Sequence, residues 1–457
     1  MNIFEENNWT TTNNHFPLND SEVQRYISVL PDSRQLIHSS KPFYLFMHFG
    51  MNTATGREWG AATETVEDFT ITNIDPKQWV HAAAASGATG IILTCKHHDG
   101  FCLWDTKTTD FNVMNTALGI DVVKALSDEC RKRNIDFGVY LSPWDMHEPC
   151  YATPQYNDFF CNQLTELLTN YGNVFEVWFD GAKGKEAKAF AYDWERYYQI
   201  VRELQPDACI SICGPDLRWV GNEAGKCRHS EFSVVPEYLT KAETVQKYSQ
   251  HTREQAELLQ KITSKDEDLG SRSVLEKHPA LKWYPAEVDV SIRKGWFHPG
   301  GGEVKSAEQL FDIYLKSVGN NCALLLNVPP NKDGLIDDED FQNLAMLGAR
   351  ILSVTSHPVA VFSPGRLTEK DGVLRFDFSS DKQISYCVIA EDISAGQRVE
   401  KFDLYLIDAN GDYSFAFGGT VIGSGKIISV NQKAKQAILI IRQSRSIPCI
   451  KSIGFFE

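Results

Sequence analysis

The residue with the clearest chemical potential is Asp180, which follows a strongly apolar run. It lies in VWFDGA (177–182), where a predicted buried strand ends and a glycine follows. A carboxylate beside apolar surroundings is costly unless another group pairs with it or a reaction uses it. An isolated Asp-Gly pair is more often a turn. Three further polar segments, however, are expected to follow strand ends at the same edge of the sheet: HFG (48–50), EWG (58–60) and KHHDG (96–100).

A second carboxyl group would allow Asp180 to take part in glycoside hydrolysis. In that reaction one carboxylate attacks the sugar or activates water, and the other group protonates the leaving oxygen. Glu223 lies in RWVGNEAG, where the flanking glycines let the backbone approach a ligand. Glu231 and Glu287 are alternatives, and Glu287 shares a strand face with Asp289, as a residue lining a barrel or a structural polar layer would. Spacing alone does not choose among the three glutamates.

Three histidines raise the alternative of a metal-dependent hydrolase. His97 and His98 are adjacent, so on a strand their side chains would point to opposite faces, although a turn could bring them together. The sequence has no H-E-x-x-H motif, the usual signature of a zinc site on a helix. We therefore expect neutral, hydrogen-bonding histidines and no metal or other cofactor.

These side chains need a scaffold that brings the ends of several strands together. Apolar runs alternate with amphipathic segments, which predicts a parallel sheet with right-handed crossovers. No G-x-G-x-x-G turn follows the first strand, which disfavours an open nucleotide-binding sheet. Polar residues instead follow successive strands, as at the active-site face of an α/β (β/α)8-like TIM barrel. These polar residues are His48, His97, His98, Trp144, Asp145 and Asp180.

The pattern of apolar and polar residues changes near residue 355. Beyond Pro358, seven short alternating runs separated by turns predict a C-terminal β-sandwich. We therefore expect a catalytic barrel over residues 1–355 and a sandwich over 356–457. A charged, helix-prone stretch at 225–282 is expected to be an insertion in the barrel.

Composition limits the partners. The 457 residues carry a net charge of −15, which disfavours nucleic acid, and no run of 18 apolar residues exists to span a membrane. The polar, acidic N-terminus does not resemble a signal peptide. A cytoplasmic location follows if the chain is as written, and a periplasmic, secreted or lysosomal one follows if a signal was trimmed.

Six segments in order resemble the α-L-fucosidases of glycoside hydrolase family 29. They are HFGMNT, EWG, KHHDGFCLW, GVYLSPW, EVWFDGA and LLLNVPP, between about residues 40 and 330. The resemblance implies a (β/α)8-like barrel, a C-terminal β-sandwich and a retaining double displacement on a fucosylated glycan. RWVGNEAG is similar to the subgroup that cleaves α-1,3/1,4-linked fucose. KGWFHPGGG departs from the family pattern at Lys294 and His298, which bears on the preferred aglycone.

The resemblance also implies roles for individual residues. Asp180 would be the nucleophile and Glu223 the acid/base. Glu287 stays the second choice for the acid/base on the residue pattern alone. Trp178 would pack on the C5 methyl group of fucose. The remaining positions that resemble pocket contacts are His48, Glu58, Trp59, His97, His98, Tyr140 and Trp296.

Three other interpretations stay open at this point. The first is a related retaining glycosidase of broader specificity, for example toward galactosides. The second is the metal-dependent barrel hydrolase described above. The third is a glycan-binding protein that has lost catalysis, which the presence of both Asp180 and Glu223 disfavours.

Overall fold

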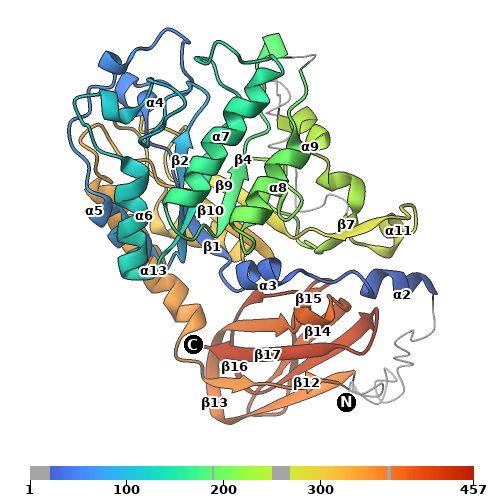
Figure 1. The fold of residues 1–457 in the computed structure, drawn as a ribbon. Helices are drawn as coiled ribbons and strands as arrows, with labels where there is room; N and C mark the ends of the chain where they lie inside the picture. The colour runs from blue at the N-terminus through green and yellow to red at the C-terminus, as the bar shows by residue number, and fades with distance from the viewer. Residues whose placement is uncertain (1–20, 188–189, 250–267, 368–371) are drawn as a thin grey trace.

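A computed structural model describes residues 21–187, 190–249, 268–367 and 372–457 (Figure 1). The polar N-terminal segment and part of the predicted insertion lie outside these residues. Across the described ranges, no helix combines the length and the apolarity that crossing a membrane requires.

The core of the molecule is a nearly closed barrel of eight parallel strands, which confirms the predicted α/β barrel. The strand order is β5-β4-β3-β2-β1-β10-β9-β6, and a single parallel bridge between Ser211 and Leu217 connects the two ends. The sequence did not predict the two-residue strand β6. The strands are β1 (Phe43–Met47), β2 (Gly90–Lys96), β3 (Asp136–Leu141), β4 (Glu176–Phe179), β5 (Cys209–Ile212), β6 (Arg218–Trp219), β9 (Ala286–Ser291) and β10 (Cys322–Asn327).

Helices surround the barrel, and capping side chains stabilise the first turns of several of them. Asp75, Asp121 and Ser306 each accept a hydrogen bond from a backbone N–H in the first turn of the helix that follows. The major helices are α5 (Pro76–Ser86), α6 (Val122–Arg133), α7 (Gln155–Asn170), α8 (Trp194–Leu204), α12 (Ala307–Ser317) and α13 (Asp338–Thr355). Shorter elements are α2 (Ser21–Ile27), α3 (Ser33–Ser39), α4 (Met51–Thr55), η1 (Val66–Asp68), η2 (Val113–Asn115) and η3 (Lys185–Ala187).

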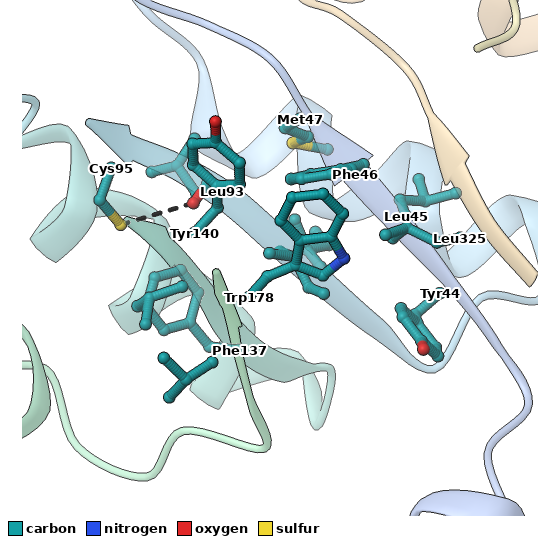
Figure 2. Packing of buried hydrophobic residues seen from close by; sticks show 14 of the residues in the cluster. Tyr44, Leu45, Phe46, Met47, Leu93, Cys95, Phe137, Tyr140, Trp178 and Leu325 are labelled. Carbon is teal, nitrogen blue, oxygen red and sulfur yellow. Dashed lines mark hydrogen bonds between the residues drawn. The ribbon is translucent and has the colours of Figure 1, made fainter. Parts of the chain in front are cut away.

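Aromatic side chains fill the barrel interior. Figure 2 shows Trp178 at the centre of this packing, with its ring 5.3 Å from that of Phe46 and stacked 5.2 Å from that of Tyr140. Alternate residues of a strand share a face, so Trp178 on β4 places Asp180, two residues further, on the same inward side. The interior packing therefore forms a rigid base for the residues at the strand ends.

The region between β6 and β9 replaces a regular strand–helix unit. Strands β7 (Val234–Pro236) and β8 (Leu281–Trp283) pair in an antiparallel two-stranded sheet outside the barrel. The other described elements here are η4 (Glu237–Thr240), α9 (Ala242–Ser249) and α11 (Arg272–Leu275).

The C-terminal strands form a second unit below the barrel in Figure 1, as the predicted sandwich requires. Two pairs of predicted short runs are each one strand of 19 residues, because register shifts let β13 and β16 continue past their irregular points. The elements are β11 (Ala360–Phe362), β12 (Gly365–Arg366), β13 (Val373–Glu391), η5 (Ile393–Ala395), β14 (Val399–Ile407), β15 (Tyr413–Gly419), β16 (Lys426–Ser444) and β17 (Cys449–Phe456).

A partly buried ion pair and a buried hydrogen bond join the C-terminal unit to the insertion. Glu400 accepts hydrogen bonds from Arg272 at 2.7 to 3.0 Å and from Arg445 at 2.9 Å. Arg445 is fully buried and also donates to the carbonyl of Gly270. The two units therefore share a charged interface.

Candidate active site

The histidines predicted for the site gather where β1 and β2 end. His48 follows β1, and His97 and His98 follow β2, which ends at Lys96. The ring centroids of His97 and His98 lie 4.1 Å apart, and those of His48 and His97 lie 5.6 Å apart. Adjacent residues on a strand would diverge, but these two converge because the chain leaves the strand before them.

Asp180 is fixed by hydrogen bonds to both carboxylate oxygens. Oδ1 accepts from the backbone N–H of Ala182 at 2.7 Å, and Oδ2 accepts from the hydroxyl of Tyr140 at 3.0 Å. Nε2 of His98 lies 3.8 Å from Oδ2. The side chain is 21% exposed, so Asp180 is an oriented carboxylate that a ligand can reach.

Partners on the far side of each ring orient His48 and His98. Ser142 has one hydroxyl hydrogen and donates it to the carbonyl of Trp144 (2.6 Å), so Nδ1 of His98 must donate to Ser142 (2.7 Å). Nδ1 of His48 likewise donates to Oδ1 of Asn327 at 2.9 Å. In the neutral form both histidines therefore keep Nε2 as a hydrogen-bond acceptor.

The environment holds these histidines in the neutral form. Burial lowers the pKa of His48 to about 3, although the hydrogen bond with Asn327 opposes this. Burial lowers the pKa of His97 well below its usual value, with further lowering by His98 and His48. Burial also lowers the pKa of His98, opposed by the negative charge of Asp180. Neutral imidazoles can bind uncharged hydroxyl groups.

Glu223 lies on the loop that follows β6 and faces the same region. Water still reaches its side chain. Crowding by the surrounding protein, followed by the charge of Asp180, raises its pKa to about 7, whereas a hydrogen bond with Trp296 lowers it. Glu223 is thus a carboxyl group that can hold a proton near neutral pH, close to the charge of Asp180. A protonated carboxyl near an ionised one suits acid catalysis.

Two loops meet at the mouth of the site. The backbone N–H of Trp296 donates to Oε2 of Glu58 at 2.8 Å. Gly295 has a φ of +85°, and a Cβ there would collide with the Glu58 carboxyl, so the approach of the loops requires glycine. Trp59 is 57% exposed, with its ring edge-on to Trp144 at 5.5 Å. Glu58 and Trp59 therefore border the opening, with the ring of Trp296 5.0 Å from that of His48.

Trp178 lies deeper, in the barrel interior. Its side chain is buried, and its indole N–H donates to Oε1 of Glu287 at 3.0 Å. Glu287 also accepts a hydrogen bond from the hydroxyl of Tyr44 and is 1% exposed. Burial raises the pKa of Glu287 well above its usual value, with the neighbouring charge of Glu176 adding to the effect. Glu287 therefore belongs to a polar layer below Trp178.

Glu231, the other alternative acid, is engaged in ion pairs. Its carboxylate lies 2.5 Å from Nη2 of Arg218 and 3.4 Å from Nη1 of Arg228, and the residue is 1% exposed. These contacts join the segment after β6 to the barrel and leave Glu231 no surface from which to act on a ligand.

Several residues that support the site were not among those predicted from the sequence. Asn327 bonds His48 and also donates to the carbonyl of Trp296 at 2.8 Å, and Ser142 orients His98. Both lie in segments that were noted, LLLNVPP and GVYLSPW, and both follow or end a strand. Their position at strand ends was the signal that could have found them.

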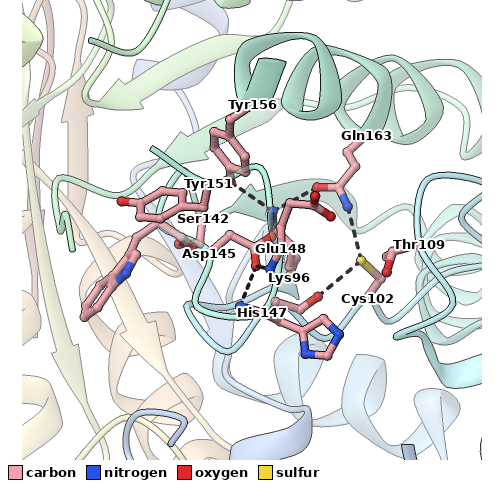
Figure 3. A network of polar contacts seen from close by, with 12 residues as sticks. Lys96, Cys102, Thr109, Ser142, Asp145, His147, Glu148, Tyr151, Tyr156 and Gln163 are labelled. Carbon is pink, nitrogen blue, oxygen red and sulfur yellow. Dashed lines mark hydrogen bonds and ion pairs between the residues drawn. The ribbon is translucent and has the colours of Figure 1, made fainter. Parts of the chain in front are cut away.

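Asp145, expected at the strand ends, belongs to a buried network under the loops (Figure 3). Lys96 donates to Asp145 and to Oε1 of Gln163, both at 2.8 Å, and all three side chains are buried. The second oxygen of Asp145 accepts from the backbone N–H groups of His147 and Glu148. The network therefore fixes the turns after β2 and β3 rather than facing a ligand.

The described residues whose spacing could suit a metal ion lie in the barrel interior and not among the three site histidines. Among the described residues, His38, Glu176 and Glu287 form a group whose candidate ligand atoms lie within 4.8 Å of one another, and His48, His97 and His98 form no such group. In the first group His38 is already bonded to Glu176 at 2.9 Å. The geometry favours hydrogen bonding over metal binding for the three site histidines.

The α-L-fucosidase family model matches residues 47–353, which is most of the chain and includes the site described above. The chain belongs to the α-L-fucosidase family, glycoside hydrolase family 29. Alpha-L-fucosidase 1 of Arabidopsis thaliana is 34% identical over 465 aligned positions, which cover 93% of this chain and 87% of the plant protein. The family assignment makes the chain a hydrolase of α-L-fucosyl bonds.

Solved structures of family members share this fold. A candidate α-L-fucosidase from Bacteroides ovatus has a TM-score of 0.84 and 39% identity, over 97% of this chain and 77% of the other. A family 29 fucosidase from Ruminococcus gnavus, solved in complex with fucose, has a TM-score of 0.79 and 26% identity, over 94% of this chain and 95% of the other. The fucosidase fold therefore extends through the C-terminal unit.

Proposed function

We propose that this fucosidase is a retaining exo-enzyme in which Asp180 is the nucleophile and Glu223 is the acid/base. The observation that carries the proposal is the pairing of an oriented carboxylate with a carboxyl group whose pKa its charge helps to raise. In the first step an Asp180 oxygen bonds to the anomeric carbon of fucose. The glycosidic C–O bond breaks, and the leaving oxygen takes the proton of Glu223.

The second step reverses these roles. Once Asp180 is esterified its negative charge is gone, so the pKa of Glu223 falls and the carboxylate becomes a base. Glu223 then takes a proton from a water molecule, whose oxygen bonds to the anomeric carbon. The bond to Asp180 breaks, and fucose leaves with its original anomeric configuration.

The surroundings of Asp180 suit an uncharged deoxysugar. His48 and His98 present Nε2 acceptors to hydroxyl groups, and the aromatic interior around Trp178 offers apolar surface for the C5 methyl group. A hydrophobic pocket discriminates against an added hydroxyl only by about 10- to 200-fold. Weak activity on related galactosides is therefore compatible with the proposal.

A 2-fluoro fucosyl fluoride tests the nucleophile directly. We expect a stable fucosyl-enzyme whose label lies on the peptide that contains Asp180. Nuclear magnetic resonance of the first product formed on a normal substrate should show retained configuration. A label on another peptide, or an inverted first product, would refute the proposed mechanism.

We also propose a preference for α-1,3/1,4-linked fucose, which is supported by the resemblance of RWVGNEAG to that subgroup. Product analysis on Lewis-type and 2′-fucosyl trisaccharides tests this preference. Faster release from the 2′-fucosyl substrate would contradict it.

A further inference from the structure

The loop that carries Glu223 runs directly against strand β9. The backbone N–H of Val220 donates to the carbonyl of Glu287, and that of Gly225 donates to the carbonyl of Asp289, both at 3.1 Å. Between them an antiparallel bridge pairs Ala224 with Val290. Both sides of Glu223 are therefore tied to the same strand.

Gly225 fixes the far end of this loop. Its φ is +69°, and a Cβ there would lie 2.9 Å from Cγ2 of Ile313 and 3.3 Å from Cβ of Val290. Only glycine fits this left-handed and crowded position without displacement. The loop therefore cannot slide along β9, and its near end, before Glu223, is where a side chain can set its position.

One side-chain contact fixes that near end. The indole N–H of Trp219, four residues before Glu223, donates to Oδ1 of Asp289 at 2.9 Å. Asp289 is 3% exposed and lies on the inward face of β9, two residues beyond Glu287. This partly buried bond connects the barrel interior to the loop of the proposed acid/base.

We infer that Asp289 is a positioning residue for Glu223, which it sets by holding Trp219 at the base of the loop. The inference rests on the proposed function, because it assigns Asp289 a part in presenting the proton of Glu223. Asp289 acts through Trp219 and does not itself need to touch the substrate.

The charges around the two carboxyls fit this arrangement. Burial raises the pKa of Asp289 well above its usual value, with Glu223 and then Glu287 adding to the effect and the hydrogen bond from Trp219 opposing it. The groups that act on Glu223 are Asp180, Glu58 and Trp296. The two carboxyl groups therefore lie close enough for the charge of Glu223 to act on Asp289.

Leaving-group dependence tests the inference. Glu223→Ala is the reference, because loss of the acid should slow natural glycans far more than an aryl fucoside with a good leaving group. Trp219→Phe keeps an aromatic ring, although a smaller one, and removes the N–H donor, and Asp289→Leu removes the acceptor. We expect both variants to lose about 10- to 100-fold in kcat/KM on a fucosylated trisaccharide, because small misplacements of a catalytic group cost this much. On the aryl fucoside the kcat/KM of both variants should stay within a factor of about three of the wild-type value, because an aryl leaving group needs little protonation.

Two controls separate positioning from stability. Asp289→Asn keeps an oxygen acceptor for Trp219 and should restore most of the lost activity. Trp104→Phe removes a matched indole–carboxylate bond, from Trp104 to Glu166 at 2.8 Å, on the outer side of the barrel. This control variant should change kcat/KM on both substrates by the same small factor. Thermal midpoints of all variants report folding.

The outcomes distinguish the two proposals. Equal losses on both substrates in Trp219→Phe and Asp289→Leu, or no loss in either, overturn the positioning role while the reference variant still supports Glu223. Absence of the substrate difference in Glu223→Ala itself overturns the acid/base assignment, and the role of Asp289 with it. If Asp289→Leu does not fold, Trp219→Phe alone decides.

Discussion

Two hydrogen bonds orient Asp180, so replacing one of its carboxylate oxygens tests its role. Asp180→Asn keeps the size of the side chain and an acceptor for Ala182, but it removes the nucleophilic oxygen. We expect turnover to fall ~10³-fold or more, as for other covalent nucleophiles. Steady-state kinetics with an aryl fucoside measure the loss. Activity within a factor of about ten of wild type would contradict the assignment.

The proton on Glu223 predicts a pH profile. The acid must be protonated to assist the leaving group, and its pKa is about 7. On a natural glycan kcat/KM should therefore be level just below pH 7 and fall as the pH rises through it, by about tenfold per unit. Glu223→Gln should abolish this alkaline limb. A limb that persists in the variant would show that another group donates the proton.

At the scale of elements, the point at which a strand ends positions the side chains that follow it. β2 ends before His97 and His98, which lets two adjacent side chains face one ligand. The Lys96 network below them then holds the turn in one conformation. Rigid strands with fixed turns present catalytic groups accurately without a mobile element.

Breaking that network should cost much more stability than a surface pair. Lys96→Met leaves Asp145 buried and without its cation, which should destabilise the fold by about 3–5 kcal/mol. Lys124→Met removes an exposed pair with Asp128, at 2.7 Å, and should cost about 0.5 kcal/mol or less. Urea denaturation of both variants gives the comparison. Equal shifts would mean that the buried pair contributes no more than a surface one.

At the scale of the whole molecule, the barrel and the C-terminal unit share a charged interface around Glu400. A division of the chain near residue 355 stays a prediction, which limited proteolysis can test. The described contacts nevertheless indicate that the two units stabilise each other, because Arg445 is buried against the insertion.

Removing Glu400 should weaken this interface. Glu400→Ala leaves the buried Arg445 without its carboxylate, which should cost about 3–5 kcal/mol. Asp403→Ala breaks the Arg442–Asp403 pair, which is partly exposed and lies within the C-terminal sheet, and should cost about 1 kcal/mol or less. Thermal unfolding and the rate of proteolytic release of the C-terminal unit measure the difference. An interface variant as stable as the control would refute the coupling.

The sequence by itself determined the barrel, the C-terminal sheet unit and the family. Apolar periodicity, helix caps and strand-end motifs are local properties, and each is readable from neighbouring residues. The sequence also indicated Asp180 as a candidate functional residue, because a carboxylate after a buried strand is costly unless another group pairs with it or a reaction uses it.

Only the tertiary structure decided which distant side chains meet. Glu223, Glu231 and Glu287 look alike as isolated glutamates, but the fold pairs Glu231 with arginines and buries Glu287 under Trp178. It leaves Glu223 within reach of the charge of Asp180. Partners such as Asn327 for His48 come from strands far apart in the chain. The pKa of a carboxyl group depends on burial and on charges brought near it by folding, so no local pattern could have fixed it.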